Sequence, residues 1–331
     1  MMPRATKDKV IYLSIQLAMA IVIAYFLVGA AFPQKNPVFT PTVVVPSPTT
    51  TAPVVSSSTP DESTTIETPI KVSSRPFENL RLTAGSAIVY DLTTGQTLFR
   101  LREQQKRPIA SITKVMTAYA ASLALTPETE VTISAADAQL ESSAGLVAGE
   151  RWRLSDLSNF TLVSSSNGGA QAIARTMTEN TGRDFIDEMN QVATEIGLEN
   201  TKFRNETGLD LYDSQISGSY STAYDLARLF THIINTDPTL LAATTRNQLT
   251  VYSLDRQPHQ AFNTDLLVAK VPNILASKTG LTDLAGGSLA LAVEPVPGHP
   301  LVIVVLGSTA QGRFTDVEKL ITEAKRDLTN Q

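Results

Sequence analysis

Residues 77–331 predict an α+β fold, in which an antiparallel sheet is flanked by helices and accompanied by a helical lobe. Two observations lead to this prediction. Paired β-rich runs joined by short turns lie near both ends of the stretch, and segments with helical spacing of apolar residues lie between them. Strands that come first and last therefore form one sheet, while the middle helices form the lobe.

The sheet is expected from two hairpins and a terminal helix. Residues 86–101, SAIVYDLTTGQTLFRL, are two β-rich runs around Thr94-Gly95, and residues 286–308 are two apolar runs around a Pro/Gly turn. Residues 314–328 carry apolar side chains at helical spacing, so they predict an amphipathic helix packed on the sheet.

Helical patterns occupy the middle of the domain. Ser111 opens the first expected helix. Further helices are predicted within residues 155–177, with Ser155 as N-cap, within residues 182–198, which end near a glycine, and within residues 221–234, with Ser221 or Thr222 as cap.

The N-terminal part predicts a membrane anchor. The uncharged run from Val10 to Phe32 holds 23 residues, enough to cross about 30 Å of hydrocarbon. Basic residues precede this run, so the positive-inside rule places residues 1–9 in the cytoplasm. A cleavable signal peptide is the alternative, but its apolar core is usually shorter, about 7–15 residues. We therefore expect a single-pass signal anchor at residues 10–32 in the cell membrane, with an extracytoplasmic catalytic domain.

Residues 33–76 are rich in Pro, Thr, Ser and Val. Such a segment has too few large side chains to form a core, so a disordered linker is expected. It would connect the anchor to the globular domain at residues 77–331.

Composition excludes several classes of function. The formal charge of -5 gives no basic face for nucleic acid. The absence of cysteine excludes disulfides, thiolate metal sites and a cysteine nucleophile. His232 lies in a predicted helix, while His259 and His299 lie in predicted proline-containing loops. Because no motif surrounds these histidines and no ligand spacing such as H-E-x-x-H occurs, neither a histidine triad nor a zinc site is expected.

Three short motifs contain side chains that could take part in catalysis. They are Ser-x-x-Lys at Ser111 and Lys114, Ser-x-Asn at Ser165 and Asn167, and Lys-Thr-Gly at residues 278–280. With 27 serines and 11 lysines, about one Ser-x-x-Lys is expected by chance. Taken alone, the first motif fits a helix N-cap and the last fits a turn at a strand end. Their joint occurrence, spaced 54 and 113 residues apart, fits one chemical function.

That function is nucleophilic catalysis, in which a serine attacks the substrate and a lysine acts as its base. Ser111 and Lys114 lie three apart, so on a helix their side chains point to the same side. Lys114 can act as base only if its pKa falls, which burial and a second cation, Lys278, would both bring about. At a helix N-terminus, backbone N–H groups would also favour the negative charge that develops during the reaction.

The remaining motif residues would serve the substrate. The Ser165 hydroxyl could relay a proton to a leaving amine, and the Asn167 amide could hold substrate or the lysine. Thr279, on a strand edge, could bind a substrate carboxylate. The boundary between the sheet and the helical lobe is the natural place for such a site.

The motif set resembles that of penicillin-binding proteins and serine β-lactamases. Longer strings are similar to the D-alanyl-D-alanine carboxypeptidase branch: RPIASITKVMTAYAA, LSNFTLVSSSNGGAQAIA, FIDEMNQVATEIGLENTKFRNETGLD, YSTAYDLARL and SKTGLTDLAGGSLA. The resemblance covers residues 77–328. It implies a β-lactamase/D,D-peptidase-like fold, acyl transfer on peptidoglycan stem peptides without metal or other cofactor, and inhibition by β-lactam antibiotics.

Carried over by position, the resemblance implies a catalytic set of Ser111 as nucleophile, Lys114 as base, and Ser165, Asn167 and Lys278 in the proton-transfer network. It implies substrate binding at Thr279, Gly280, Leu281 and Arg313. In the family, the backbone N–H groups at Ser111 and Leu281 hold the oxyanion. Arg313, in the string QGRFTDVEKL, would bind the terminal carboxylate, with a surface charge on a turn as its alternative.

One departure from the family lies beside the site. The usual Ser-Gly-Asn-Asp reads Ser-Ser-Asn-Gly, with Gly168 in place of the acid, so the local packing is expected to differ. The resemblance favours a membrane-anchored serine D-Ala-D-Ala carboxypeptidase. The alternatives are a D,D-endopeptidase with the same residues, a class A-like β-lactamase, which would need a Glu-x-x-x-Asn that we do not find, and a non-catalytic wall-binding relative.

Overall fold

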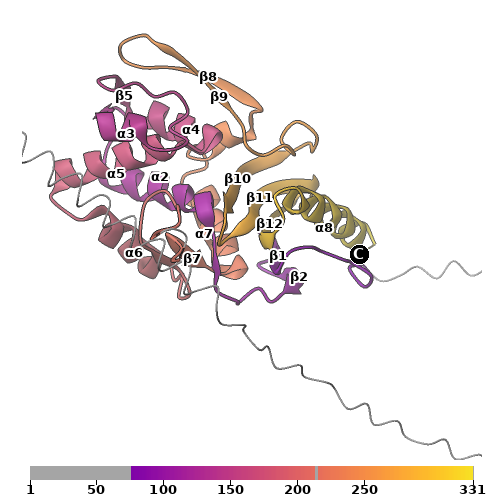
Figure 1. Ribbon diagram of the computed structural model, residues 1–331. Coiled ribbons are helices and arrows are strands. Elements are labelled where there is room, and N and C mark those ends of the chain that lie inside the picture. The colour runs from indigo at the N-terminus through magenta and orange to yellow at the C-terminus, as the bar shows by residue number, and fades with distance from the viewer. Residues whose placement is uncertain (1–75, 213–214, 331) are drawn as a thin grey trace, which may run out of the picture. The chain divides into compact units, whose positions relative to one another are not determined.

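The computed structural model describes residues 76–212 and 215–330, and its largest sheet has five antiparallel strands in the order β10-β11-β12-β1-β2 (Figure 1). The strands are β1 (Ser86–Asp91), β2 (Thr97–Leu101), β10 (Ile274–Thr282), β11 (Gly286–Val296) and β12 (His299–Ser308). β1 pairs with β12, so the two predicted hairpins join in one sheet. β10 forms the outer edge and pairs on one side with β11.

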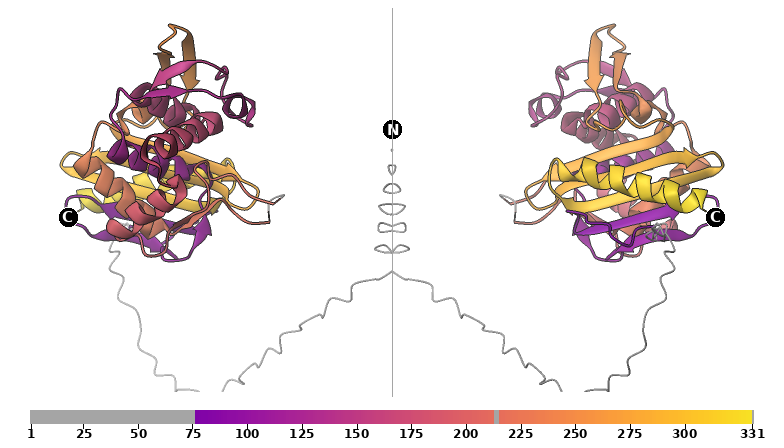
Figure 2. Two further views of the ribbon diagram at one scale, coloured as in Figure 1. Left: turned by 90° about the vertical axis from the view of Figure 1, so that its left-hand side faces the viewer. Right: turned by 90° about the vertical axis from the view of Figure 1, so that its right-hand side faces the viewer.

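Both faces of the sheet are covered. Along β12, Ile303 and Val305 face a core shared with α8 (Gly312–Thr329), whereas Val302 and Val304 face the core of the other helices. Figure 2 shows α8 across one face and the remaining helices on the other. Burial on both faces accounts for the continuous apolar runs of β11 and β12.

The helical part surrounds one buried helix. Its helices are α2 (Thr113–Ala124), α3 (Ala135–Gln139), α4 (Leu154–Ser164), α5 (Asn167–Thr181), α6 (Phe185–Glu195) and α7 (Ala223–Thr236), with 3-10 turns η1 (Ala110–Ile112) and η2 (Ala242–Thr245). In α2 every residue from 113 to 121 is buried. A helix buried on all sides belongs to the interior, so α2 carries its polar side chains into the core.

The loops between the main elements contain short paired strands, which were not predicted from the sequence. β3 (Arg107–Pro108), β7 (Ser219–Ser221) and β6 (Lys202–Phe203) form a three-stranded sheet. β4 (Glu130–Thr132) pairs with β5 (Arg151–Arg153), and β8 (Gln248–Tyr252) pairs with β9 (Pro258–Phe262). Pieces of two to five residues are too short for a recognisable period-2 pattern.

Two helix predictions need correction. Residues 155–177 are not one helix, because α4 ends at Ser164 and α5 begins at Asn167. Ser155 is not the N-cap, since α4 already begins at Leu154 and its N-cap is Arg153. The cap of α7 was predicted correctly: the Thr222 side chain accepts from the Asp225 N–H at 2.9 Å.

The histidines differ in part from expectation. His232 lies in α7 as predicted, and its Nε2 is 2.8 Å from the Tyr119 hydroxyl. His259 and His299 lie in strands β9 and β12 rather than in loops. His259 Nε2 pairs with the Glu150 carboxylate at 3.0 Å, so this histidine has a structural partner.

Within the described ranges, no helix has both the length and the apolar character needed to span a bilayer. The anchor expected at residues 10–32 and the linker expected at residues 33–76 lie outside the described residues, apart from Pro76.

Candidate active site

Ser111 lies in η1, a tight turn between β3 and α2. It is not the cap of α2, because the N-cap is Ile112 and no side chain caps this helix end. The preceding Ala110 has a φ of 49°, a left-handed conformation that costs energy for a residue with a Cβ. The Ser111 side chain is only half-buried, so it remains accessible.

Two glycines allow neighbouring backbone to close on this turn. A Cβ added at Gly280 on β10 would lie 2.6 Å from the Ile109 carbonyl oxygen. A Cβ added at Gly208 would lie 2.0 Å from the Ala110 carbonyl oxygen, and Gly208 also has a φ of 79°. The serine turn is therefore held between β10 and the 205–209 loop, at positions where only glycine fits.

Lys114 lies one helical turn after Ser111 and is fully buried. Its Nζ donates to Ser111 Oγ at 2.8 Å and to the Thr207 carbonyl at 2.8 Å. Burial lowers the pKa of Lys114 well below its usual value, and the charge of Lys278 lowers it further, against a smaller opposing effect of Glu206. A lowered pKa favours the neutral amine form of lysine, which is the form that can accept a proton.

Lys278 is the second buried lysine of the site, on strand β10. Its Nζ donates to Ser165 Oγ at 2.9 Å and to the Thr279 carbonyl at 2.9 Å. Burial and the charge of Arg313 lower the pKa of Lys278 to about 7, while the Asp265 carboxylate opposes them. The predicted Ser111/Lys114 pair is therefore joined by a hydrogen bond, and a second one joins Ser165 to Lys278, 113 residues further along the chain.

Ser165 forms the junction between α4 and α5. Its φ of 60° and ψ of 33° place it in the left-handed region, which ends α4. The next residue, Ser166, caps α5 by accepting from the Gly169 N–H at 3.0 Å. This break turns the Ser165 hydroxyl toward Lys278, and strained backbone of this kind is common at functional sites.

Asn167 begins α5 and is anchored by the loop that follows α3. Its Nδ2 donates to the Glu141 carbonyl at 2.9 Å, and its N–H donates to the Ser142 carbonyl at 3.0 Å. Its Oδ1 is buried and accepts no hydrogen bond within the described part of the chain. A buried acceptor without a partner is costly, so a donor outside the described hydrogen bonds is expected at this oxygen.

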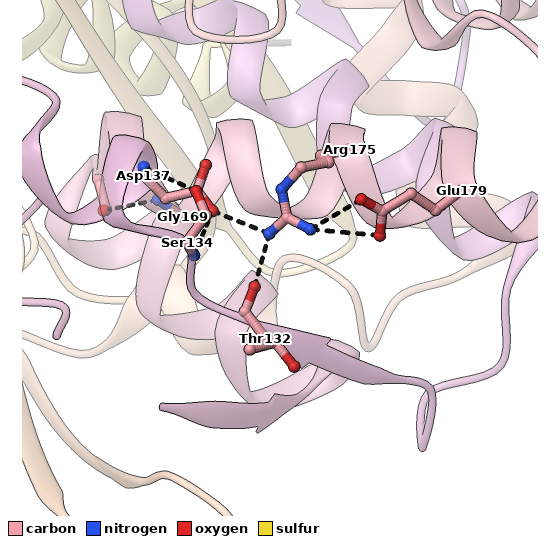
Figure 3. A network of polar contacts seen from close by, with 7 residues as sticks. Thr132, Ser134, Asp137, Gly169, Arg175 and Glu179 are labelled. Carbon is pink, nitrogen blue, oxygen red and sulfur yellow. Dashed lines mark hydrogen bonds and ion pairs between the residues drawn. The ribbon is translucent and has the colours of Figure 1, made fainter. Parts of the chain in front are cut away.

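The position of α3 explains Gly168. A Cβ there would lie 2.2 Å from the Asp137 carbonyl oxygen, so the α3 backbone occupies the space of a larger residue. Arg175 of α5 binds α3 by donating to the buried Asp137 carboxylate at 2.9 Å (Figure 3). Within α5 itself, Arg175 also donates to both Glu179 oxygens at 3.2 Å. α3 and α5 are therefore in close contact at Gly168.

The predicted substrate-binding residues lie along β10. Thr279 shares a hydrogen bond with the Thr264 hydroxyl at 2.5 Å. Arg313, at the start of α8, donates from Nη1 to the Gly280 carbonyl at 2.7 Å, so its guanidinium lies against the Lys-Thr-Gly strand. The Leu281 side chain is 51% exposed at the end of β10.

Sequence reasoning missed four neighbours of these residues: Glu206, Thr207, Thr264 and Asp265. The carbonyl of Thr207 binds Lys114, and burial raises the pKa of the Glu206 carboxyl against the lowering charge of Lys114. No motif marks these residues, although Glu206 and Thr207 fall within the quoted string FRNETGLD. Within the described residues, no group of His, Asp or Glu side chains is arranged to hold a metal ion.

The comparisons with known proteins define the class of protein. The family model described as D-alanyl-D-alanine carboxypeptidase matches residues 70–310. The chain belongs to this family, which is a family of serine hydrolases.

Several curated relatives are named D-alanyl-D-alanine carboxypeptidase or D-alanyl-D-alanine endopeptidase. The chain is 31% identical over 259 residues to D-alanyl-D-alanine carboxypeptidase DacD of Escherichia coli, covering 74% of this chain and 64% of the relative. It is 31% identical over 254 residues to a D-alanyl-D-alanine endopeptidase of the same organism, covering 73% of this chain and 77% of the relative. The chain thus spans less than two thirds of the carboxypeptidase and more of the endopeptidase.

Solved structures confirm the α+β fold of penicillin-binding proteins. Penicillin-binding protein D2 of Listeria monocytogenes in its ampicillin-bound form is 29% identical, with a TM-score of 0.64, covering 74% of this chain and 98% of that one. D-alanyl-D-alanine carboxypeptidase DacD of Francisella tularensis is 25% identical, with a TM-score of 0.67, covering 76% and 72%. The sheet flanked by helices with a helical part was therefore predicted correctly.

Proposed function

We propose that this protein is a membrane-anchored serine D,D-carboxypeptidase, which removes the terminal D-alanine from peptidoglycan stem peptides through an acyl-enzyme on Ser111. The observation that carries the proposal is the 2.8 Å hydrogen bond between Ser111 Oγ and the Nζ of a fully buried Lys114. A hydroxyl needs an adjacent base to become a nucleophile, and Lys114 is the base within reach.

In the acylation step, Ser111 Oγ attacks the carbonyl carbon between the two D-alanines and Lys114 Nζ takes its proton. The backbone N–H groups of Ser111 and Leu281 stabilise the oxyanion. Protonated Lys278 donates to Ser165, which passes its own hydroxyl proton to the leaving nitrogen. The C–N bond then breaks, and D-alanine departs with a neutral amine.

Substrate would be oriented by the polar groups around β10 and α5. The unpaired Asn167 Oδ1 accepts from a peptide N–H of the stem. Thr279 and Arg313 bind the terminal carboxylate, for which the Arg313 fork is geometrically suited. After D-alanine leaves, Lys114 releases its extra proton and Lys278 takes one up through solvent, which restores both lysines to their starting states. Water then attacks the ester carbonyl while Lys114 Nζ takes a proton from that water, and Lys114 returns this proton to Ser111 Oγ as the ester C–O bond breaks.

β-Lactam antibiotics should acylate Ser111 by the same step, because their strained amide resembles the scissile bond. The related Listeria monocytogenes protein has been solved in ampicillin-bound and cefotaxime-bound forms, which supports this part of the proposal. We infer that the ester hydrolyses slowly, since no Glu-x-x-x-Asn carboxylate is available to activate water.

The full chain, incubated with a stem pentapeptide, tests the proposal. We expect free D-alanine from wild type and none from Ser111→Ala, which keeps the fold but removes the nucleophile. Pentapeptide left intact by the wild-type protein would contradict a carboxypeptidase.

A D,D-endopeptidase is the second candidate, because two relatives with that name match at 31% and 32% identity and are covered over 77% and 74% of their length. Incubation with a cross-linked dimer distinguishes the two activities. Cleavage of the dimer without release of D-alanine from pentapeptide would establish the endopeptidase instead.

The membrane anchor at residues 10–32 is the part of the proposal that sets location. N-terminal mass analysis of the protein in membrane fractions should find the uncleaved N-terminus. A mature N-terminus near Ala31 would mean that the segment is a signal peptide and that the enzyme is secreted.

A further inference from the structure

A short segment between β9 and β10 lies against strand β10 beside Lys278. The Thr264 hydroxyl bonds to that of Thr279, and Asp265 Oδ2 accepts from Ser277 Oγ at 2.5 Å. Asp265 Oδ1 accepts from the Leu267 N–H at 2.9 Å, and Asp265 is only 1% exposed. The carboxylate is therefore fixed by a bond to each oxygen, next to the Lys-Thr-Gly strand.

The charges around this carboxylate form a compact set. The charge of Asp265 raises the pKa of both Lys278 and Arg313, whereas the charge of Arg313 lowers the pKa of Lys278. The pKa of Lys114 is lowered by the charge of Lys278 and raised by the charge of Glu206. A buried cation without a compensating charge tends to lose its proton, so each carboxylate partly opposes the loss of charge by the lysine that it acts on.

We propose that Asp265 is a positioning residue of the proposed carboxypeptidase site, whose fixed carboxylate keeps Lys278 protonated toward Ser165. Lys278 and Ser165 are then ready to protonate the leaving nitrogen, while Lys114 acts as the base. This inference rests on the proposed function.

The direction of the effect follows from the electrostatics of the site. Burial raises the pKa of Asp265, whereas its hydrogen bonds with Ser277 and Leu267 and the charges of Arg313 and Lys278 lower it. The Asp265 charge in turn raises the pKa of Lys278, which stands at about 7 after the larger lowering by burial and by Arg313. Loss of that charge moves the pKa of Lys278 downward, so less of it is protonated at neutral pH.

The test is the pH profile of Ser111 acylation by benzylpenicillin in the full chain, between pH 5 and 9. In Asp265→Asn, which keeps the shape of the side chain, we expect the alkaline limb to move to lower pH. The loss of rate would be about tenfold at pH 8 and less than about threefold at pH 6, since one pKa unit changes a population tenfold.

Two matched controls separate charge from packing. Ser277→Ala removes a hydrogen bond to Asp265 but keeps the charge, so its alkaline limb should stay near the wild-type pH. Asp225→Asn neutralises another buried carboxylate, which accepts from the Asn200 N–H and the Thr201 hydroxyl in a different part of the fold. That variant should leave the profile unchanged.

An equal loss at all pH values in Asp265→Asn, or an unchanged profile, would overturn the inference. Thermal unfolding shows whether each variant is folded. If Asp265→Asn does not fold, Asp265→Ser loses the same charge and Asp265→Glu retains it, and only the first should displace the limb. If wild-type protein is not acylated at all, the proposed function fails before the role of Asp265 is reached.

Discussion

At the scale of single residues, the chemistry depends on Lys114 being able to lose its proton inside the protein. An arginine at this position would keep a positive charge of similar reach but cannot be deprotonated. We therefore expect Lys114→Arg to slow acylation by benzylpenicillin by about 10²- to 10⁴-fold, the usual contribution of a positioned base. Time-resolved mass analysis of the adduct measures this rate, and a wild-type rate in Lys114→Arg would show that another group is the base.

The charge of Glu206 leads to a separate prediction, about the acid limb of the pH profile of acylation. Its negative charge raises the pKa of Lys114, against burial and Lys278. Glu206→Gln removes that charge, so the pKa of Lys114 falls and the neutral amine persists to lower pH. The acid limb of the acylation profile should move to lower pH, and a move to higher pH would contradict the assignment of Lys114 as base.

At the scale of secondary-structure elements, the contact between α3 and α5 accounts for a residue that departs from the family pattern. Gly168→Asp would restore the usual acid, but its Cβ meets the backbone of Asp137. We expect a loss of about 1–3 kcal/mol in the free energy of unfolding, typical of overpacking. Thr178→Asp, at an exposed position of the same helix, is the matched control for denaturant unfolding. Equal stability of the two variants would contradict the close approach of α3.

Element positions also show what could be predicted from the sequence. The hairpins and the terminal helix were predictable because their patterns are local. The break at Ser165 was not, since the left-handed turn brings its hydroxyl to Lys278, far along the chain. Asp265 and Glu206 carry no motif, and their importance arises only when folding brings them beside buried lysines.

At the scale of the whole molecule, the sheet holds the site together by joining β10 to the helix that supplies Arg313. Leu320 of α8 is fully buried against the sheet. Leu320→Ala should reduce the free energy of unfolding by about 2–5 kcal/mol, as cavities in a core do. Leu123→Ala is the control, because Leu123 is 56% exposed and its truncation leaves no cavity. Similar losses in the two variants would contradict the packing of α8 on the sheet.

The most direct test of the central claim uses the full chain and benzylpenicillin. Intact mass and peptide mapping should place one penicilloyl group on Ser111 in wild type and none in Ser111→Ala. An unmodified wild-type protein, or an adduct on another residue, would contradict the account.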